Sequence, residues 1–372
     1  MSAESSQEAD RQERLPLEEE IKFGVVGPLD DLPERFKALG AVSNEHSRRL
    51  ENIYFDTADN ALFERGIGLR LRRNGTQCEM TLKLKGENIG GLHSRGELNV
   101  PVDNELQVPD LSRFPAGVLP EGLELAQIQQ KLRPICHIDF ERRSFDFRAL
   151  NCQFEVDYDQ GGILLGEGLS HPINELEVEL KDSAGSLEDT MRVFTALITG
   201  FAEQDMPLVL EPFSKMHRAA VLLGGERNYL DLRPLEAAGD LGAYIRSLLL
   251  AFENLYGLFL IKHDPLVFGC VIAALKMLIK SLKMLRRSGR AAFTSESRDP
   301  LPYRDDLKVI ISILKSFALR LDRLQKAVCD CALSANAEAM DALMSNLRRM
   351  ERHYRIFVIP LKLRMLLSLL VS

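Results

Sequence analysis

The sequence lacks several features that would each indicate a particular class of protein. Its six cysteines are scattered without a CxxC pair, and the CxC of Cys329 and Cys331 has no histidine or cysteine partner at metal-ligand spacing. We therefore expect reduced thiols in a reducing compartment, not disulfides or a thiolate metal site. No GxxxxGK[ST] loop occurs, which excludes a P-loop nucleotide site.

Export and membrane signals are also missing from the sequence. The first fourteen residues have no apolar core, so we expect a disordered tail over 1–14 and not a signal peptide. The two most apolar stretches, YIRSLLLAFENLYGLFLI and IFVIPLKLRMLLSLLV, carry charges and are typical of bundle helices. A cytoplasmic protein with no membrane partner is expected.

The charge is divided unevenly along the 372 residues. Residues 241–372 contain 21 Lys or Arg and 11 Asp or Glu, a net charge of +10, whereas residues 1–240 have a net charge of −17. The length accommodates two domains. We expect one domain over 15–225 and a second over 236–372, with different tasks or with mutual attraction.

Apolar spacing predicts a different class of structure for each half. The first half has strands of period two, separated by Gly, Pro, Asn and Asp turns, and few helices. The expected strands are 17–25, 51–57, 67–73, 77–86, 93–102, 138–148, 152–159, 162–166 and 174–181, and the expected helices are 30–40, 124–133, 186–204 and 213–224. Eight or so antiparallel strands at this spacing favour an α+β domain built on a closed or nearly closed barrel. The second half predicts an all-α bundle with helices near 238–262, 265–288, 302–333 and 335–371, the last broken around Pro360.

Charged side chains occupy alternate positions in six of the expected strands. They are Glu18, Glu20 and Lys22; Arg70 and Arg72; Lys83 and Lys85; Arg95 and Glu97; Glu155, Asp157 and Asp159; and Glu175, Glu177 and Glu179. A solvated sheet face would also be charged. It would mix its residue types, however, whereas here bases gather on middle strands and acids on the first and last. The pattern favours a binding surface, because like charges two positions apart repel one another.

A barrel with these faces inward would need a hydrated interior, because burying unpaired charge costs several kcal/mol per ion. Converging bases predict a polyanion, and arginine suits bidentate contact with phosphate. Carboxylates beside phosphate would repel it unless a hard divalent cation, Mg²⁺ or Mn²⁺, lay between them. A metal–polyphosphate site with water as the nucleophile is therefore expected.

The order of these motifs resembles the CYTH superfamily of triphosphate tunnel metalloenzymes. Glu18-x-Glu20-x-Lys22 resembles the family's ExExK signature. It is followed by IYFDTADNALFERGIGLRLRR, TLKLKG, RGEL, DFERRSF, FEVDYDQG, ELEVEL and SKMHRA. The resemblance covers about residues 15–222 and implies an eight-stranded antiparallel tunnel that hydrolyses a triphosphate compound, foremost inorganic triphosphate. A class IV-type adenylate cyclase and a non-catalytic polyphosphate-binding protein stay open as alternatives, and no nucleic-acid partner is expected.

The resemblance also implies roles for particular residues. Metal binding falls to Glu18, Glu20, Glu175, Glu177 and Glu179. Catalytic roles fall to Glu18, Glu20, Lys22, Glu97, Glu155 and Asp159. Phosphate binding falls to Lys22, Arg70, Arg72, Lys83, Lys85, Arg142 and Lys215. Arg142 is expected to face inward and Arg143 outward, and ordinary structural roles are expected for His93, His137 and His217.

The helical half more faintly resembles the CHAD domain, which often follows CYTH and binds polyphosphate. The corresponding helix is PLVFGCVIAALKMLIKSLKMLRR, with Phe268 and Val271 where the family's His and Arg are expected. Basic residues persist at Lys276, Lys280, Lys283, Arg286 and Arg287. A degenerate CHAD-like domain is the resulting expectation.

Overall fold

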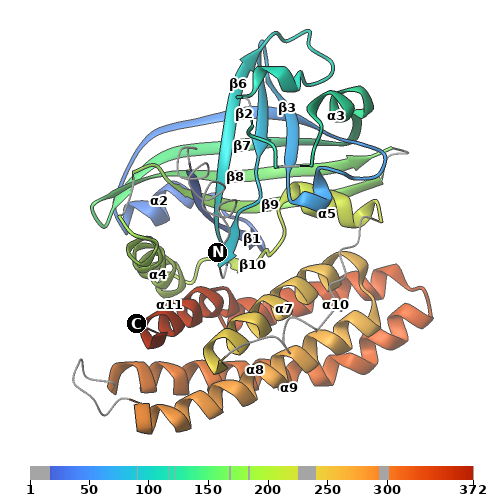
Figure 1. The fold of residues 1–372 in the computed structure, drawn as a ribbon. Helices are drawn as coiled ribbons and strands as arrows, with labels where there is room; N and C mark the ends of the chain where they lie inside the picture. Colours follow the sequence, from blue (N-terminus) through green and yellow to red (C-terminus); the bar gives the residue numbers. More distant parts are fainter. Residues whose placement is uncertain are drawn as a thin grey trace.

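The computed structural model describes residues 17–89, 91–115, 117–120, 122–166, 169–182, 185–224, 240–292 and 301–371. Figure 1 shows a β-barrel lying on a layer of long helices. The strands are β1 Leu17–Val25, β2 Ala41–Asp56, β3 Gly68–Asn74, β4 Gln77–Lys83, β5 Glu87–Ile89, β6 Leu92–Val102, β7 Arg133–Ala149, β8 Cys152–Leu165, β9 Leu169–Leu180 and β10 Leu208–Leu210. The helices are α2 Leu32–Lys37, α3 Leu125–Lys131, α4 Leu187–Glu203, α5 Lys215–Leu222, α7 Leu241–Lys262, α8 Pro265–Ala292, α9 Leu301–Leu333, α10 Ala337–His353 and α11 Ile359–Val371, with short 3-10 turns η1 Phe63–Arg65, η2 Leu111–Arg113 and η3 Ile356–Val358.

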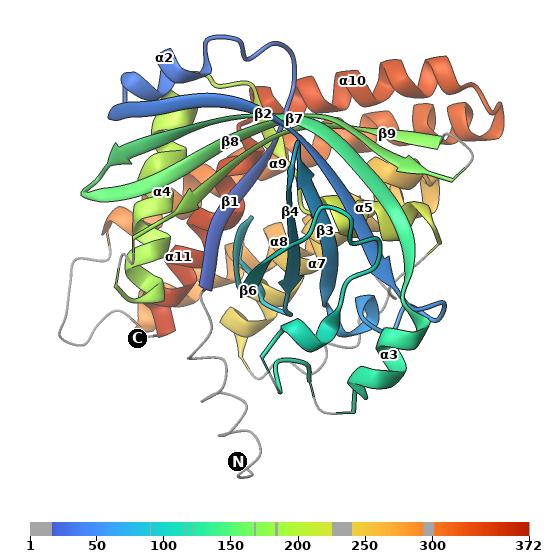
Figure 2. The same cartoon turned by 90° about the horizontal axis from the view of Figure 1, so that it is seen from above.

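Eight antiparallel strands close the barrel. Strand β1 pairs with β9 along one edge and with β6 along the other, so the order β1-β9-β8-β7-β2-β3-β4-β6 returns to its start. Figure 2 shows the long strands β2, β7, β8 and β9 arching over one side and the shorter β3, β4 and β6 on the other. The predicted α+β class, an eight-stranded antiparallel barrel followed by a helical region, is confirmed.

The barrel keeps its charged faces inside and its apolar faces outside. On β1, Ile21 and Phe23 are buried on the outer face of the barrel. The Phe23 ring lies 6.2 Å from the ring of Phe201 on α4 and 5.5 Å from that of Phe357 on η3, measured between centroids. Alternation along the strand therefore directs Glu18 and Glu20 into the interior.

Some strand boundaries differ from the prediction. Residues 152–159 and 162–166 form one strand, β8, because Gly161 allows β7 to approach closely. A Cβ atom on Gly161 would lie 2.2 Å from the backbone oxygen of Asp139. Strand β2 begins ten residues before the expected 51–57, and the three-residue strands β5 and β10 were not predicted.

The helix ends follow local capping chemistry. Ser186 caps α4 in a capping box with Asp189. The predicted break near Pro360 is present, but the chain turns earlier, at Arg355, whose φ is 51°. Pro360 instead lies in the first turn of α11, where proline is well tolerated.

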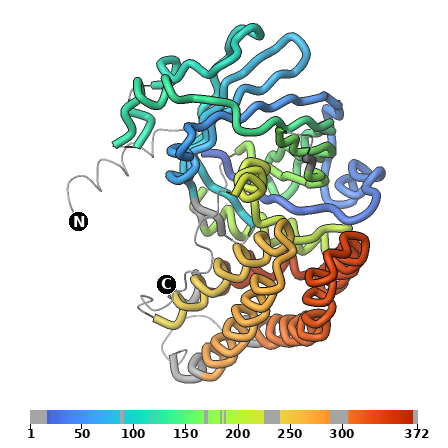
Figure 3. Tube along the Cα trace, turned by 90° about the vertical axis from the view of Figure 1, so that its right-hand side faces the viewer, coloured from blue at the N-terminus to red at the C-terminus, as the bar shows by residue number. Residues whose placement is uncertain are grey.

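The helical half shares its hydrophobic core with the barrel. One cluster of buried side chains includes Phe23 and Val178 from the barrel, Phe201 from α4, and Leu248 and Leu363 from the C-terminal helices. Figure 3 shows from the side that the helices lie directly beneath the strands. The segment between the two predicted domains, 226–235, and the predicted tail 1–14 lie outside the described residues.

Helix α10 also holds the end of β10 through buried polar contacts. The Glu351 carboxylate accepts a hydrogen bond from the backbone N–H of Leu210, and the Arg348 guanidinium donates to the Leu210 carbonyl at 2.7 Å. The Tyr256 hydroxyl of α7 donates to Glu351 at 2.7 Å. These contacts join two helices of the C-terminal half to the strand that extends β1.

Two helices, Leu241–Lys262 and the Pro265–Arg287 part of α8, are long and apolar enough to cross a membrane by length and composition. In both, 56% of the most apolar window is buried within the protein. Core helices of globular proteins meet the same criterion, and one or two such helices are weak evidence of a membrane. Their role as bundle helices stays a prediction.

Candidate active site

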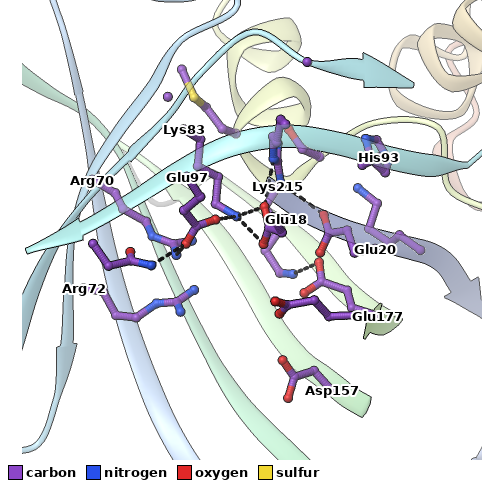
Figure 4. Close-up of a pocket in the computed structure, with 18 of the residues that line it drawn as sticks. Glu18, Glu20, Arg70, Arg72, Lys83, His93, Glu97, Asp157, Glu177 and Lys215 are labelled. Carbon is purple, nitrogen blue, oxygen red and sulfur yellow. Dashed lines mark hydrogen bonds and ion pairs between the residues drawn. The ribbon is translucent and has the colours of Figure 1, made fainter. Parts of the chain in front are cut away.

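The barrel encloses a cavity of about 1360 Å³. Figure 4 shows its central part, with Arg70, Arg72 and Lys83 to one side and Glu20 and Glu177 to the other. The predicted site residues that line it are Glu18, Glu20, Lys22, Arg70, Arg72, Lys83, Lys85, Glu97, Arg142, Glu155, Glu177, Glu179 and Lys215. The fold thus brings together residues that are almost two hundred positions apart in sequence.

Glu18 and Glu20 on β1 place two neighbouring carboxyl groups on the wall of the cavity. Both bind the Arg95 guanidinium of β6, at 3.0 Å and 3.1 Å, and Glu18 also binds the Lys83 ammonium at 2.8 Å. Burial alone would raise the pKa of Glu18, but the charges of Lys83 and Arg95 hold it well below its usual value. Burial, together with the negative charges of Glu18 and Glu177, raises the pKa of Glu20 to about 8. With this pKa Glu20 is largely protonated at neutral pH, and a cation bound beside its carboxylate would favour the loss of that proton.

Arg70 and Arg72 on β3 place two guanidinium groups on the other side of the cavity. Arg72 donates from Nε to the Asn52 side chain at 2.9 Å, and an Arg70 nitrogen lies 3.8 Å from Glu97. Burial, with the positive charges of Arg70 and Arg142, lowers the pKa of Arg72 to about 10. Arg72 remains charged at neutral pH, so these guanidinium groups form a positive pole that would favour an anion.

Between these poles, Lys83 is shared between carboxylates. Its ammonium binds Glu18 at 2.8 Å and also contacts Glu97, which accepts a hydrogen bond from Asn99 at 2.9 Å. The predicted phosphate ligand Lys85 lines the cavity as an exposed side chain, beside Gly66.

Arg142 and Lys215 are held in place by a buried group of acids. Arg142 donates to both Asp159 oxygens, at 2.7 Å and 2.6 Å, and to Glu177 at 2.8 Å, and it also contacts Asp157. Lys215 lies 2.7 Å from Asp159 and 2.9 Å from Glu177. Their positive charges are therefore fixed in position before any ligand arrives.

Two predicted site residues lie behind the cavity instead of on its surface. Asp159 and Glu175 are both fully buried and are absent from the cavity lining. Asp159 holds Arg142 and Lys215, whereas Glu175 contacts Lys215 and binds Arg218 of α5 at 2.5 Å. In this position they support Arg142 and Lys215, the cations that line the cavity.

The remaining predicted residues lie toward the two ends. Lys181 bridges Glu155 and Glu179, with 2.9 Å to each. Lys22 donates to the Phe213 carbonyl at 2.6 Å, and burial lowers its pKa. Arg143 points out of the barrel as expected, donating to the Leu29 carbonyl at 2.9 Å with its guanidinium over the Tyr158 ring.

The predicted site residues did not include Arg95, Arg218 or His93, although Arg95 was among the alternating charged side chains and His93 was expected to have a structural role. Arg95 shares the alternating phase of Glu97, so the pattern already contained its signal. Arg218 is three residues after Lys215, one helical turn along α5, and it is buried because it pairs with Glu175. His93 lines the cavity in register with Glu20, and burial, with the charges of Lys22 and Arg95, holds its pKa well below the usual value.

Two groups of carboxylates are candidates for holding a divalent cation. Oxygens of Asp159, Glu175 and Glu177 lie within 4.8 Å of one another, but Lys215 already contacts all three, and Asp159 and Glu175 are absent from the cavity lining. Glu18 and Glu20 are also paired, with Lys83 and Arg95, but both line the cavity. Their oxygens therefore fit a hard cation such as Mg²⁺ or Mn²⁺ beside a bound anion better than the buried cluster does.

Residues 17–201 match the family model of the CYTH domain. The matched region, which is similar to CYTH domains, comprises the barrel and most of α4. The family resemblance expected from the motif order is confirmed for this half, while the resemblance of the helical half to CHAD stays a prediction.

Among curated proteins, the inorganic triphosphatase of Haemophilus influenzae is 33% identical over 180 residues. The aligned part is 48% of this chain and 48% of the relative, so the chain spans about half the length of the curated relative that it matches. The relative's name concerns a triphosphatase, which agrees with the class of enzyme expected from the motifs.

Solved structures of low identity are also similar. A Hippeastrum protein, described as an adenylyl cyclase with a dominant triphosphatase activity, is 18% identical, with 56% of this chain and 97% of that chain covered and a TM-score of 0.39. A structure of an inorganic triphosphatase is 17% identical, with 47% and 78% covered and a TM-score of 0.19. At these TM-scores neither likeness bears on the function of the chain.

Proposed function

We propose that the barrel hydrolyses the terminal phosphoanhydride bond of inorganic triphosphate with the help of Mg²⁺ or Mn²⁺. The observation that carries the proposal is a pair of poles in one cavity of the barrel. The guanidinium groups of Arg70 and Arg72 form the first pole, and the carboxyl groups of Glu18 and Glu20 form the second. A phosphate chain suits the first pole and a divalent cation suits the second. The CYTH match and the triphosphatase relative support the same class of reaction.

The chain's own residues would act mainly by position and charge. Arg70, Arg72 and Lys83 would bind phosphate oxygens, while Arg142 and Lys215 supply charges that their buried acids already hold in place. Glu18 and Glu20 would hold the cation, which would supply positive charge that stabilises the negative charge of the reacting phosphate. Water attacks the terminal phosphorus atom, the P–O–P bond breaks, and phosphate and pyrophosphate leave.

The proposal is tested by phosphate release from tripolyphosphate with Mg²⁺ and with Mn²⁺. We expect release by the wild type and a loss of about 10²-fold in kcat/KM for Glu20→Gln, because an amide cannot supply the charged oxygen ligand that a divalent cation prefers. Glu19→Gln is the matched control. Glu19 is on the same strand but faces outward, where its carboxylate accepts from the Thr190 hydroxyl at 3.4 Å.

Two results would contradict the proposal. The first is a wild type that binds tripolyphosphate without releasing phosphate, which would favour a non-catalytic polyphosphate-binding protein. The second is an equal loss of activity in Glu19→Gln and Glu20→Gln, which would contradict the inward phase of Glu20.

The cavity offers little surface for an adenine ring, as a cyclase would need. Tyr54, Phe63 and Phe213 line it, but their exposed fractions are only 6%, 5% and 1%. We therefore expect no cyclic AMP from ATP, and its detection together with pyrophosphate would point to the cyclase.

A further inference from the structure

The C-terminal helices bring side chains to the barrel at two places. Leu250 and Asn254 of α7 and Arg364 of α11 are part of the cavity lining. Arg348 of α10 is absent from that lining and lies behind it, beside Gly24 of β1. Figures 1 and 3 show that these helices lie directly beneath the barrel. Charged side chains of both halves therefore meet at this end of the barrel.

Arg348 occupies space that the barrel leaves open at the end of β1. It donates to the Leu210 carbonyl at 2.7 Å, and its other terminal nitrogen lies 3.7 Å from the Glu211 carboxylate. A Cβ atom on Gly24 would lie 3.8 Å from that second nitrogen. Gly24 shares the inward phase of Lys22, so the guanidinium lies on the side of β1 that faces the interior.

A chain of ion pairs leads from Arg348 to the cavity. The Glu211 carboxylate lies 3.7 Å from Arg348 and 3.4 Å from Arg218 of α5. The other terminal nitrogen of Arg218 lies 2.5 Å from Glu175, and Glu175 also contacts the ammonium of Lys215, which lines the cavity. Positive and negative charges alternate along this chain, so each is held by its neighbours.

The chain of ion pairs is largely sheltered from solvent. The side chains of Arg218 and Glu175 are 3% and 0% exposed, and those of Arg348 and Glu211 are 19% and 10% exposed. Burial alone would raise the pKa of Glu211, but the charges of Arg218 and Arg348 hold it below its usual value. Glu211 is therefore ionised at neutral pH, and removing one of its partners shifts its full attraction to the other because buried charges are poorly screened.

The surroundings of Lys215 depend on how Arg218 is shared between two carboxylates. Arg218 lies closer to Glu175 than to Glu211, at 2.5 Å against 3.4 Å. Without Arg348, Glu211 would draw Arg218 away from Glu175. Glu175 would then be left to Lys215, whose ammonium would be held more tightly by its buried acids and would attract an anion in the cavity less.

We propose that Arg348 is a positioning residue of the helical half that fixes Lys215 in the cavity, acting through Glu211, Arg218 and Glu175. Arg348 touches no substrate itself. The proposal rests on the proposed function, because it takes Lys215 as one of the charges that attract the phosphate chain. Arg348, Glu211 and Arg218 all lie outside the CYTH match at 17–201, so the match does not contain this arrangement.

The test is calorimetric binding of tripolyphosphate to the full-length protein in buffer with EDTA. We expect Arg348→Gln to weaken binding about fivefold, an effect typical of a residue coupled to a site through a network. Arg348→Lys should restore most of the affinity, because it keeps a positive charge beside Glu211. Arg352→Gln is the matched control and should leave the affinity unchanged. Arg352 is one turn further along α10 and pairs with Asp205 at 3.0 Å, outside the chain of ion pairs.

A double-mutant cycle separates positioning from folding. Arg348 also holds the Leu210 carbonyl, so Arg348→Gln should lower the melting midpoint in any background. Its effect on affinity should instead vanish in the Glu211→Gln background, because Arg218 then has no second carboxylate to draw it from Glu175. If Arg348→Gln does not fold by itself, the double variant is compared directly with Glu211→Gln, and a weaker affinity of the double variant contradicts the proposal.

Three results would overturn the positioning role. They are an unchanged affinity in Arg348→Gln, an equal loss in Arg352→Gln, and a loss that persists in the Glu211→Gln background. A wild type that binds no tripolyphosphate would overturn this role together with the proposed function. Phosphate release is measured separately with Mg²⁺ and Mn²⁺. The expected pattern of affinities without phosphate release would overturn the proposed hydrolysis and leave the role of Arg348 in place.

Discussion

The orientation of most candidate site residues follows from the alternation of side chains between the two faces of each strand. Glu18 and Glu20 face the cavity while Ile21 and Phe23 are buried outside it, and Arg142 and Arg143 face opposite ways. Each of these orientations follows from period two once the sheet is taken to close.

Depth within the site could not be predicted in the same way. Asp159 and Glu175 share the inward phase of their strands, yet they lie behind Arg142, Lys215 and Arg218. Their depth depends on where α5 packs, which is a tertiary contact that strand periodicity does not contain. Arg364 has no signal at all, because nothing in the sequence shows that α11 reaches the barrel.

Arg72 and Arg73 provide a test of the positive pole with adjacent residues. We expect Arg72→Gln to raise the KM for tripolyphosphate by about tenfold, because charged hydrogen bonds to phosphate are lost. Arg73→Gln should leave KM unchanged, since Arg73 donates to the Leu106 carbonyl at 2.8 Å and is absent from the cavity lining. Steady-state kinetics check both variants, and equal effects would contradict the assignment.

Glu253 should make the stability of the protein depend on pH. Burial raises its pKa to about 7, although the charge of Arg364 opposes the shift. The folded state therefore keeps a proton that the unfolded state loses above its lower pKa, so the free energy of unfolding falls as pH rises from about 4.5 to about 7. Relative to Glu253→Gln, the wild type should lose roughly 3 kcal/mol across this range. Urea unfolding at pH 5 and pH 8 measures it, and identical losses in both proteins would refute the prediction.

At the scale of elements, the identity and order of the barrel strands were predictable and some of their ends were not. The two expected strands 152–159 and 162–166 form one strand, β8. They were predicted as separate strands because adjacent glycines, here Gly161 and Gly162, indicate a turn. In the fold Gly161 instead permits close contact with β7. The short strands β5 and β10 have three residues each and pair only at the edges of longer strands, so no periodicity could reveal them.

The two adjacent glycines of β8 give an element-scale prediction. A Cβ atom at residue 161 would lie 2.2 Å from the Asp139 oxygen, whereas one at residue 162 would lie 3.7 Å from the His171 oxygen. We expect Gly161→Ala to lower the free energy of unfolding by about 1–3 kcal/mol or more, and Gly162→Ala to change it little. Denaturant unfolding compares them, and equal stability of the two variants would count against the close β7–β8 approach.

At the scale of the whole molecule, the charge difference between the halves suggested two domains, and the structure joins them through one core. Phe23 of β1 and Phe357 of η3 are in direct contact, and α10 holds both backbone groups of Leu210. Composition predicts that each half has core-forming residues. It does not predict that the apolar outer face of the barrel is buried against the C-terminal helices.

The shared core predicts that the full chain unfolds as a unit. We expect one calorimetric transition, and Glu351→Ala should lower its midpoint because the Leu210 N–H and the Tyr256 hydroxyl lose a buried acceptor. Glu338→Ala, an exposed position on the same helix, is the control. Two separate transitions in the wild type would show that the halves fold independently.

The reversed alternation of the barrel, charged inside and apolar outside, also limits how the gene can change in length. Inserting or deleting one codon within a strand such as β1 would turn Ile21 and Phe23 toward the lumen and Glu18 and Glu20 toward the helices. Changes of two codons preserve the faces. Natural variants should therefore gain or lose strand residues in pairs, or place single changes in the turns.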